Sequence, residues 1–472
     1  MKKVQSTPPI QSNHIPSPQK EPASQPSTST SPSSSSLTSS SKNHHSKLVK
    51  GNTTNGQRSC LHSLSAKPSF DLVVIGSGGG PVEDNLSCYF LKSHNQRWDQ
   101  GFISIEAGSG LGSIISLLSD PERSVVFDDF GASDSDEEDA GSQLDQRQRQ
   151  RRSRSDLTRR AGWIYSNIKS FLITHSHLDH IFSLVLTAGS LSNLPKSVYS
   201  IESTQKYLDK VFRGGIWPRL ADSTGKLPLW MRTIKTGSRH SSIPILPSIS
   251  ARAFKLFHGT DSKMGKRSLD ESSDFSGSIY STAFFLTENQ SKNQFLFFGD
   301  LGPDSLSPER EQKLNLAVWK HASRLFNDGK MKTIFIECSY PSSRPPELLY
   351  GHLSPIYLFE ELLCFAKQVT GRDNCEEQSY QGVLDGLNVI IIHIKEEILS
   401  SKNQGNIKAA RPTNGTRLSD RSKKLDYDIH PLEIPTCTIK QQILNEILEL
   451  EINRYQFGCK FLIADQGDRF EF

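Results

Sequence analysis

Residues 172–190, LITHSHLDHIFSLVLTAGS, place three histidines and one aspartate within six positions, between two apolar runs. Because side chains alternate along an extended segment, His175 and His177 point to the same side and can bind one ion. Asp179 and His180 follow where the chain turns into an apolar helix, so they can face a second ion. A single histidine here would usually be a hydrogen-bonded core residue, but four ligand types so close together favour a metal site. Imidazole and carboxylate ligands suit Zn²⁺ best, with Mn²⁺ or Fe²⁺ as alternatives.

Three later segments supply further candidate ligands at the ends of apolar runs. They are His258 in FKLFHG, Asp300 in FLFFGDLG and His393 in VIIIHIK. Each is a weak signal alone, because a histidine in an apolar strand is usually buried and hydrogen-bonded, and an aspartate beside glycine is usually a turn residue. Their order and their placement at strand ends together predict a site for two ions.

Apolar runs predict strands that dominate the first half of the chain and alternate with helices later. This pattern favours an α/β (α+β) fold in which helices cover sheets. Glycine-rich turns follow the first strands, in residues 69–85 and 100–114. Further strands are expected at 124–127, 169–174, 197–201, 254–258, 281–287, 294–300, 332–337 and 388–395, and helices at 307–326, 355–369 and 440–455.

The mean hydropathy of −0.47 is low for an enzyme because polar residues are concentrated in a few segments. Residues 1–66 are rich in serine and proline and cannot bury enough apolar surface to fold, so we expect a disordered tail. Residues 67–472 are expected to form a single domain. Polar, aperiodic stretches at 131–160, 261–277 and 401–424 are expected to be surface insertions in it, since apolar strands resume after each.

Charge and cysteine content indicate which partners and which cellular compartment to expect. The tail holds seven Lys or Arg against one acid while the whole chain has a net charge of +4, so the folded part is near neutral and calls for neither a nucleic acid nor a membrane. Seven scattered cysteines favour a reducing compartment over a disulfide framework. No apolar run reaches the roughly 18 residues of a membrane span, and no secretory signal is present. We expect a cytoplasmic or nucleocytoplasmic protein; a homodimer stays open.

Two other patterns offer rival interpretations. The turn VVIGSGGGP suggests dinucleotide binding, but G-x-G-x-x-G counted from Gly76 would need glycine where Pro81 stands. The glycines are better explained by a close approach of the backbone to the metal site, and Asn85 beyond them could touch substrate. The arginine-rich residues 147–160 could bind RNA, yet this stretch contains no aromatic residue, the next one being Trp163, and an acidic block precedes it.

The order of these motifs resembles the metallo-β-lactamase superfamily and, within it, the class II cyclic-nucleotide phosphodiesterases of fungi. The family motif around the histidines usually closes with Ser followed by Ala or Pro, whereas Ala188 and Gly189 stand here. The resemblance covers about residues 70–395. The similar segments are IGSGGGPVEDN, IEAGSGLGS, THSHLDHIFSLVL, FHG, FFGDLG, FIECSY, YGHLSP and NVIIIHIK.

The resemblance implies a four-layer αββα sandwich with two metal ions at one edge. It implies His175, His177 and His258 on one ion, Asp179, His180 and His393 on the other, and Asp300 bridging both. Such a pair of ions would provide a hydroxide that attacks the phosphorus of a 3′,5′-cyclic nucleotide, cAMP or also cGMP, and yields a nucleoside 5′-monophosphate.

Related phosphodiesterases of this superfamily suggest His352 as the general acid for the departing 3′ oxygen, oriented by Glu337, with Asp179 also counted as catalytic. The alternative is that His352 is a metal ligand or a loop histidine. Rival functions are a tRNA 3′-processing endonuclease of the same fold and a catalytically inactive interaction protein.

Overall fold

The computed structural model describes residues 59–60, 67–131, 154–190, 195–260, 278–307, 313–373, 375–396 and 437–472. The expected insertions at 261–277 and 401–424 lie outside these residues, as do most of the expected tail and most of 131–160. Two parts differ from expectation. Ser59–Cys60 form a short strand, β1, and residues 154–160 begin a helix, α3 (Arg154–Ser166), in which Ala161, Ile164 and Tyr165 are buried.

The first sheet has the strand order β1-β16-β2-β3-β4-β5-β6-β8-β7. The neighbours β16, β2, β3 and β4 pair antiparallel, whereas β4, β5, β6, β8 and β7 are parallel to one another, so chain crossovers connect these parallel strands. The bounds are β2 Phe70–Gly76, β3 Cys88–Ser93, β4 Phe102–Ile105, β5 Ile168–Leu172, β6 Lys196–Ser200, β7 Ala221–Asp222, β8 Leu229–Thr233 and β16 Arg469–Glu471.

The second sheet has the order β15-β14-β13-β12-β11-β10-β9. The long hairpin of β10 and β11 is antiparallel, and β12 to β15 are parallel to one another. The bounds are β9 Ile243–Pro244, β10 Ile249–Thr260, β11 Ser278–Glu288, β12 Gln294–Phe298, β13 Met331–Glu337, β14 Asn388–Ile392 and β15 Lys460–Ile463.

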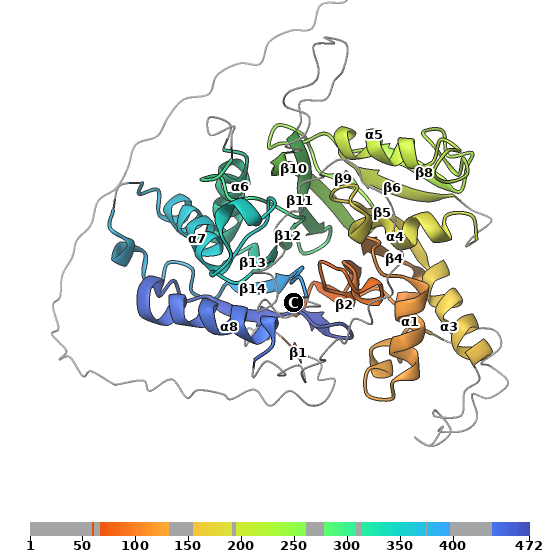
Figure 1. Cartoon of the computed structure of the whole chain (residues 1–472), viewed down its shortest axis with the longest axis horizontal. Coiled ribbons are helices and arrows are strands. Elements are labelled where there is room, and N and C mark those ends of the chain that lie inside the picture. The colour runs from red at the N-terminus through yellow and green to blue at the C-terminus, as the bar shows by residue number, and fades with distance from the viewer. Residues whose placement is uncertain are drawn as a thin grey trace, which may run out of the picture. The chain divides into compact units, whose positions relative to one another are not determined.

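Helices cover the outer face of each sheet, so the layers run helix, sheet, sheet, helix (Figure 1). On the first sheet lie α1 (Leu111–Ser119), α3, α4 (Leu178–Thr187) and α5 (Glu202–Val211). On the second lie α6 (Leu314–Asn327), α7 (Pro355–Thr370) and α8 (Ile439–Leu450), which continues as a π-helical turn over Glu451–Tyr455. No helix in these ranges is long and apolar enough to cross a bilayer.

Three buried apolar clusters fill the spaces between the four layers. Alternating residues of one strand belong to different clusters: Leu72 and Val74 face the other sheet, whereas Val73 and Ile75 face the helices. A strand buried on both faces reads as a continuous apolar run, which is why these strands were detectable in the sequence. The expected αββα sandwich is confirmed.

One expected strand is wrong. Residues 124–127, SVVF, form a short 3₁₀ helix (Ser124–Phe127) that packs Val126 and Phe127 into the cluster beneath α1 and α3. Four apolar residues do not distinguish a strand from one helical turn, because periodicity cannot be read over so short a run. The Ser124 N–H donates to the Asp120 carbonyl, and this hydrogen bond to the preceding turn stabilises the helical conformation.

Candidate active site

Seven predicted ligands come from both sheets and converge at the ends of their strands. Their positions follow from the fold: the loop after β5 carries two histidines, the first turn of α4 carries an aspartate and a histidine, and single residues lie within β10 and directly after β12 and β14. In this order they are His175, His177, Asp179, His180, His258, Asp300 and His393.

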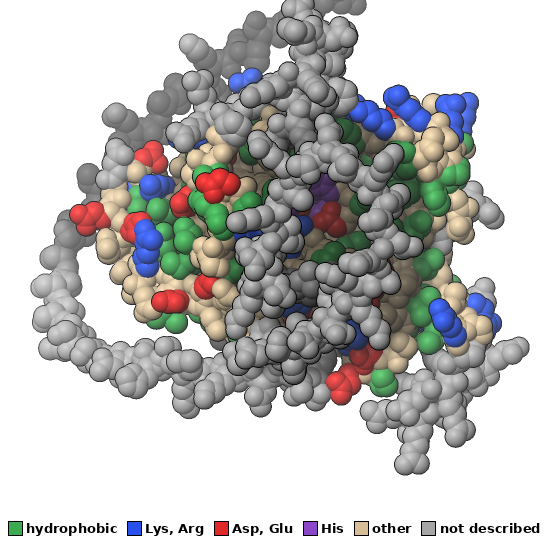
Figure 2. Space-filling view, viewed as in Figure 1, with side chains coloured by type: hydrophobic (Ala, Val, Ile, Leu, Met, Phe, Trp, Pro, Cys, Tyr) green, Lys and Arg blue, Asp and Glu red, His purple; other side chains and the backbone are tan. Residues whose placement is uncertain are grey.

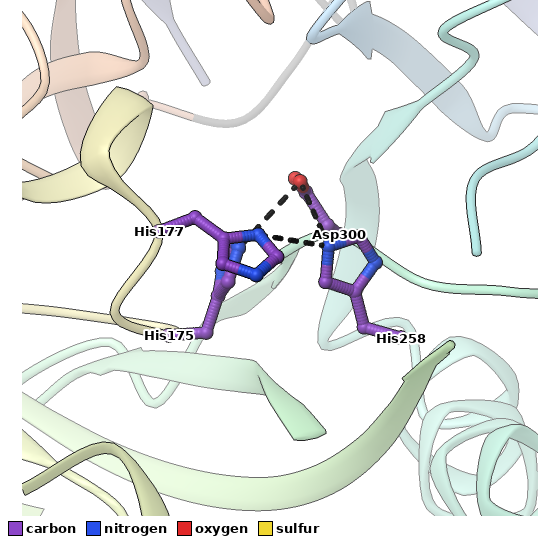
Figure 3. A group of neighbouring side chains, drawn as sticks. All are labelled: His175, His177, His258 and Asp300. Atoms are coloured by element: carbon purple, nitrogen blue, oxygen red, sulfur yellow. Dashed lines mark hydrogen bonds and ion pairs between the residues drawn. The ribbon is translucent and has the colours of Figure 1, made fainter. Parts of the chain in front are cut away.

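The first group consists of three histidines around one carboxylate. The ligand atoms of His175, His177, His258 and Asp300 all lie within 4.8 Å of one another. Figure 3 shows His175 and His177 entering from one side and His258 from the other, with Asp300 beside all three. The rings of His175 and His177 lie 4.5 Å apart, so both face the same point, as their alternate spacing predicts.

The second group shares the same aspartate. Asp179, His180, His393 and Asp300 also place ligand atoms within 4.8 Å of one another. Asp300 Oδ2 lies 3.3 Å from Nε2 of His180 and 3.3 Å from Nε2 of His393. Asp300 is therefore the one residue common to both groups, and a carboxylate oxygen in that position is able to bridge two cations.

The outward nitrogens of three histidines have hydrogen-bonding partners that fix each ring, and that of His180 lies near a carboxylate without forming a hydrogen bond to it. Such contacts select the tautomer that leaves the other nitrogen bare for a cation. The facing pairs are His175 Nδ1 with Thr174 Oγ1 at 3.0 Å, His180 Nδ1 with Glu106 Oε1 at 3.4 Å, His258 Nδ1 with the Gly351 carbonyl at 2.9 Å and His393 Nδ1 with Ser339 Oγ at 3.1 Å.

The inward atoms fit divalent cations. Among the described residues, His175 Nε2 and Asp300 Oδ2 are buried and have no hydrogen-bond partner. A buried polar atom without a partner is costly, and coordination to a cation removes that cost. The donor set of imidazoles and carboxylates is the one that zinc and related ions prefer.

Burial and charge shift the proton affinities in the way such a site requires. Burial, together with the neighbouring His180, holds the pKa of His175 well below its ordinary value, and burial lowers that of His258 to about 3. These rings are therefore neutral and able to ligate. Burial also opposes charge on His180, but Asp300, Asp179 and Glu106 outweigh it and raise its pKa. A cation bound there would displace that proton.

Glu337 and His352 form a hydrogen-bonded pair beside the first group. Nδ1 of His352 lies 2.9 Å from Oε1 of Glu337 and 3.8 Å from Oδ2 of Asp300. Burial and the charge of Asp300 raise the pKa of Glu337 to about 7, and burial lowers that of His352 to about 3. With Nδ1 facing the carboxyl group, Nε2 is the nitrogen of His352 that remains for a proton transfer.

The glycine-rich turn packs against the second group. A Cβ on Gly79 would lie 2.6 Å from Cε1 of His393, so this position has room for glycine alone. Asn85 holds the turn, because its side-chain oxygen accepts from the Ser77 N–H at 3.0 Å. The side chain of Asn85 is half-buried, and its contact with substrate stays a prediction.

Three residues near the ligands were not singled out from the sequence. Glu106 lies on a left-handed backbone (φ 61°) beside His180, Ser339 contacts His393, and Lys395 Nζ lies 3.8 Å from Asp179 Oδ2. Glu106 and Ser339 stand in IEAGSG and FIECSY, segments already noted for their resemblance. A glutamate before Ala-Gly or a serine after a strand is otherwise an ordinary turn residue.

Comparison with known proteins decides the family. Residues 146–421 match the family described as cAMP phosphodiesterases class-II. The chain belongs to this family.

The similarity to known relatives covers most of the chain. The chain is 28% identical to 3′,5′-cyclic-nucleotide phosphodiesterase 1 of Saccharomyces cerevisiae, over 69% of this chain and 88% of that protein. It is 26% identical to the 3′,5′-cyclic-nucleotide phosphodiesterase of Aliivibrio fischeri, over 87% and 96%. The crystal structure of unliganded yeast PDE1 superposes with a TM-score of 0.60 at 24% identity, covering 86% of this chain and all of that one. The chain therefore has the fold of yeast PDE1.

Proposed function

We propose that this phosphodiesterase hydrolyses 3′,5′-cyclic nucleotides to nucleoside 5′-monophosphates with two divalent cations as cofactors, and so ends cAMP signals. Family membership and the names of its relatives support the reaction and the substrate class. The observation that carries the proposal is the position of Asp300. Its carboxylate belongs to both histidine groups and to a third group with Glu337 and His352.

The assignment of ligands follows these groups. His175, His177 and His258 would hold one cation, and Asp179, His180 and His393 the other, with Asp300 between them. Bound divalent cations supply an activated water at neutral pH and positive charge against the phosphoryl oxygens. Zinc suits the donors best, and manganese and iron(II) are the alternatives.

The proton for the departing 3′ oxygen is assigned to His352. An alkoxide is a poor leaving group, and a positioned acid typically contributes 10²- to 10⁴-fold. In this role His352 would carry a proton on both nitrogens: Nε2 would give its proton to the departing oxygen, and Nδ1 would donate to Glu337, which fixes the ring. Since burial lowers the pKa of His352 to about 3 in the free protein, the anionic phosphate of a bound substrate would have to raise it. Since the Leu301 N–H and the Ser339 hydroxyl also donate to Glu337, the carboxyl group is itself held in place.

Asp179 and Asn85 complete the assignment. Asp179 would orient the second cation, and its carboxylate lies between His393 Nε2 at 3.2 Å and Lys395 Nζ at 3.8 Å. Asn85 is proposed to reach the substrate from the glycine-rich turn. Figure 2 shows histidine and acidic side chains together at the surface near the middle of one face.

A single assay tests the function. Purified protein with Zn²⁺ is offered cAMP, cGMP and a precursor tRNA before and after chelation. Release of 5′-AMP or 5′-GMP that chelation abolishes is expected. Cleavage of the precursor tRNA would instead indicate a tRNA-processing enzyme, and the absence of any activity would indicate an interaction protein.

A cytoplasmic location is proposed as well. None of the described cysteines forms a disulfide, which suits a reducing compartment. A homodimer stays a prediction, and the mass in solution measured by light scattering tests it.

A further inference from the structure

Two tyrosines and an arginine lie together beside His352. Tyr340 follows β13, and its ring lies 5.9 Å from the His352 ring at 74°. The guanidinium of Arg344 lies 4.1 Å from the centre of the Tyr340 ring and 5.8 Å from that of Tyr350. We call Tyr340, Arg344 and Tyr350 the aromatic shelf.

The shelf is anchored to the ligand set. Gly351 follows Tyr350 with φ 81°, and a Cβ on it would lie 2.6 Å from the His258 backbone. The Gly351 carbonyl faces His258 Nδ1 at 2.9 Å. Tyr350 itself takes a left-handed conformation (φ 53°), which a bulky residue rarely adopts. The turn therefore fixes the backbone from which the Tyr350 ring projects next to the site.

Arg344 has the electrostatics of a binding residue. Its Nε donates to the Leu348 carbonyl at 2.9 Å, and the contacts found for its guanidinium among the described residues are with aromatic rings, not with carboxylates. Tyr350 is 63% exposed, so one large ring beside the guanidinium faces solvent. A planar cation and an exposed aromatic ring side by side are the groups on which nucleic-acid bases stack.

We propose that the aromatic shelf binds the purine base of the cyclic nucleotide. This inference rests on the proposed function, because it places the departing 3′ oxygen at His352. The ribose then lies over His352. The base is attached to the ribose across the ring from the 3′ oxygen and therefore extends beyond His352. Since the ring of Tyr340 lies 5.9 Å from that of His352, the shelf is within reach of a base attached to this ribose.

If the shelf binds the base, ligands that carry a base should bind more tightly than those without one, with little discrimination between bases. Stacking is tolerant of base identity because every base presents a π-face, so cAMP and cGMP should bind comparably. Loss of one stacking partner is expected to weaken binding of a purine nucleotide about tenfold. It should leave binding of a sugar phosphate without a base unchanged.

Binding of 5′-AMP and of ribose 5-phosphate to the zinc-loaded protein, measured by calorimetry, tests the shelf. Arg344→Met keeps the apolar stem, and Tyr350→Ser changes an exposed ring. The matched control is Arg454→Met, since Arg454 stacks on Tyr455 at 4.7 Å and pairs with Glu377, outside the shelf. Thermal unfolding confirms that each variant is folded.

The expected result is an affinity for 5′-AMP about tenfold lower in both shelf variants, with ribose 5-phosphate and the control unaffected. The KM for cAMP should rise while kcat changes little. Equal affinities of the wild type for the two ligands, or unchanged 5′-AMP binding in both variants, would overturn the shelf. Because binding is measured without turnover, a protein that binds 5′-AMP through the shelf but does not hydrolyse cAMP would refute only the proposed reaction.

Discussion

At the scale of single residues, the site depends on backbone conformations that side-chain patterns do not reveal. His393 and Glu106 both have φ 61°, in a region that costs a non-glycine residue energy. His393 was predicted because it ends an apolar strand, and β14 stops one residue before it. Glu106 was missed because nothing local marks a glutamate that faces a histidine 74 positions further along the chain.

Replacement of Gly79 by alanine is predicted to displace His393. The added Cβ would lie 2.6 Å from its Cε1, closer than carbon atoms approach without a shift. Zinc content of the purified variant should fall from two to about one per chain, with activity lost. The control is Gly112→Ala, in α1, where an added Cβ meets nothing within 4 Å. Equal zinc contents in both variants would show that the turn does not position the ring.

Ser339 is predicted to couple the proton donor to the second ligand group. Its hydroxyl contacts Glu337 Oε2 at 2.5 Å and His393 Nδ1 at 3.1 Å. Ser339→Ala should lower kcat about tenfold through misorientation of Glu337, and zinc should be retained. Ser170→Ala, a buried serine on β5, should leave kcat unchanged. A kcat for Ser339→Ala equal to the wild-type value would refute the coupling.

At the scale of elements, most strands and helices could be predicted because apolar runs report burial. The helices α6 and α7 also share a buried polar contact that the pattern did not reveal. Glu361 of α7 accepts from Trp319 Nε1 at 2.6 Å and from Asn315 Nδ2 at 3.0 Å. A glutamate at a core position of a helix looks like a surface residue until its partners on another helix are known.

Glu361 should make stability depend on pH. Burial and nearby Asp304 raise its pKa from 4.5 to about 7, so the folded state binds the proton more tightly than the unfolded state. The resulting stabilisation is complete at low pH and is lost as pH rises from about 4.5 to about 7. It should amount to about 2 kcal/mol between pH 5 and pH 8.

Urea unfolding at several pH values measures this effect. Glu361→Gln should remove the decline in unfolding free energy relative to the wild type. Glu360→Gln, on the exposed side of the same helix, should keep it. Identical pH profiles for the wild type and Glu361→Gln would contradict the prediction.

At the scale of the whole molecule, pattern alone could not give the arrangement. The second sheet keeps chain order, but in the first sheet β16, the last strand, pairs with β2, the first long one. The seven ligands stretch from His175 to His393, and only the packing of two sheets brings them within a few ångströms. Placement at strand ends predicted that the ligands converge, periodicity predicted the elements, and resemblance to a family supplied the four layers and the assignment of each ligand to an ion.

Arg469 is predicted to hold the carboxyl-terminal strand in the first sheet. It is buried and pairs through two nitrogens with Asp71 and through two with Asp129. Arg469→Met should lower the unfolding free energy by about 3–5 kcal/mol, since it leaves buried carboxylate charge less compensated. Arg454→Met removes an exposed pair and should cost less than about 1 kcal/mol. The unfolding free energies are measured with a denaturant. Comparable decreases in Arg469→Met and Arg454→Met would contradict this assignment.

Zinc stoichiometry combined with turnover tests the paired-cation site most directly. Elemental analysis should find two zinc ions per wild-type chain, about one in His393→Ala, and two in His352→Ala. The last variant should nevertheless hydrolyse cAMP about 10²- to 10⁴-fold more slowly, because it lacks only the acid. A wild-type chain that binds no more than one ion, or a His352→Ala chain that loses an ion, would contradict the account.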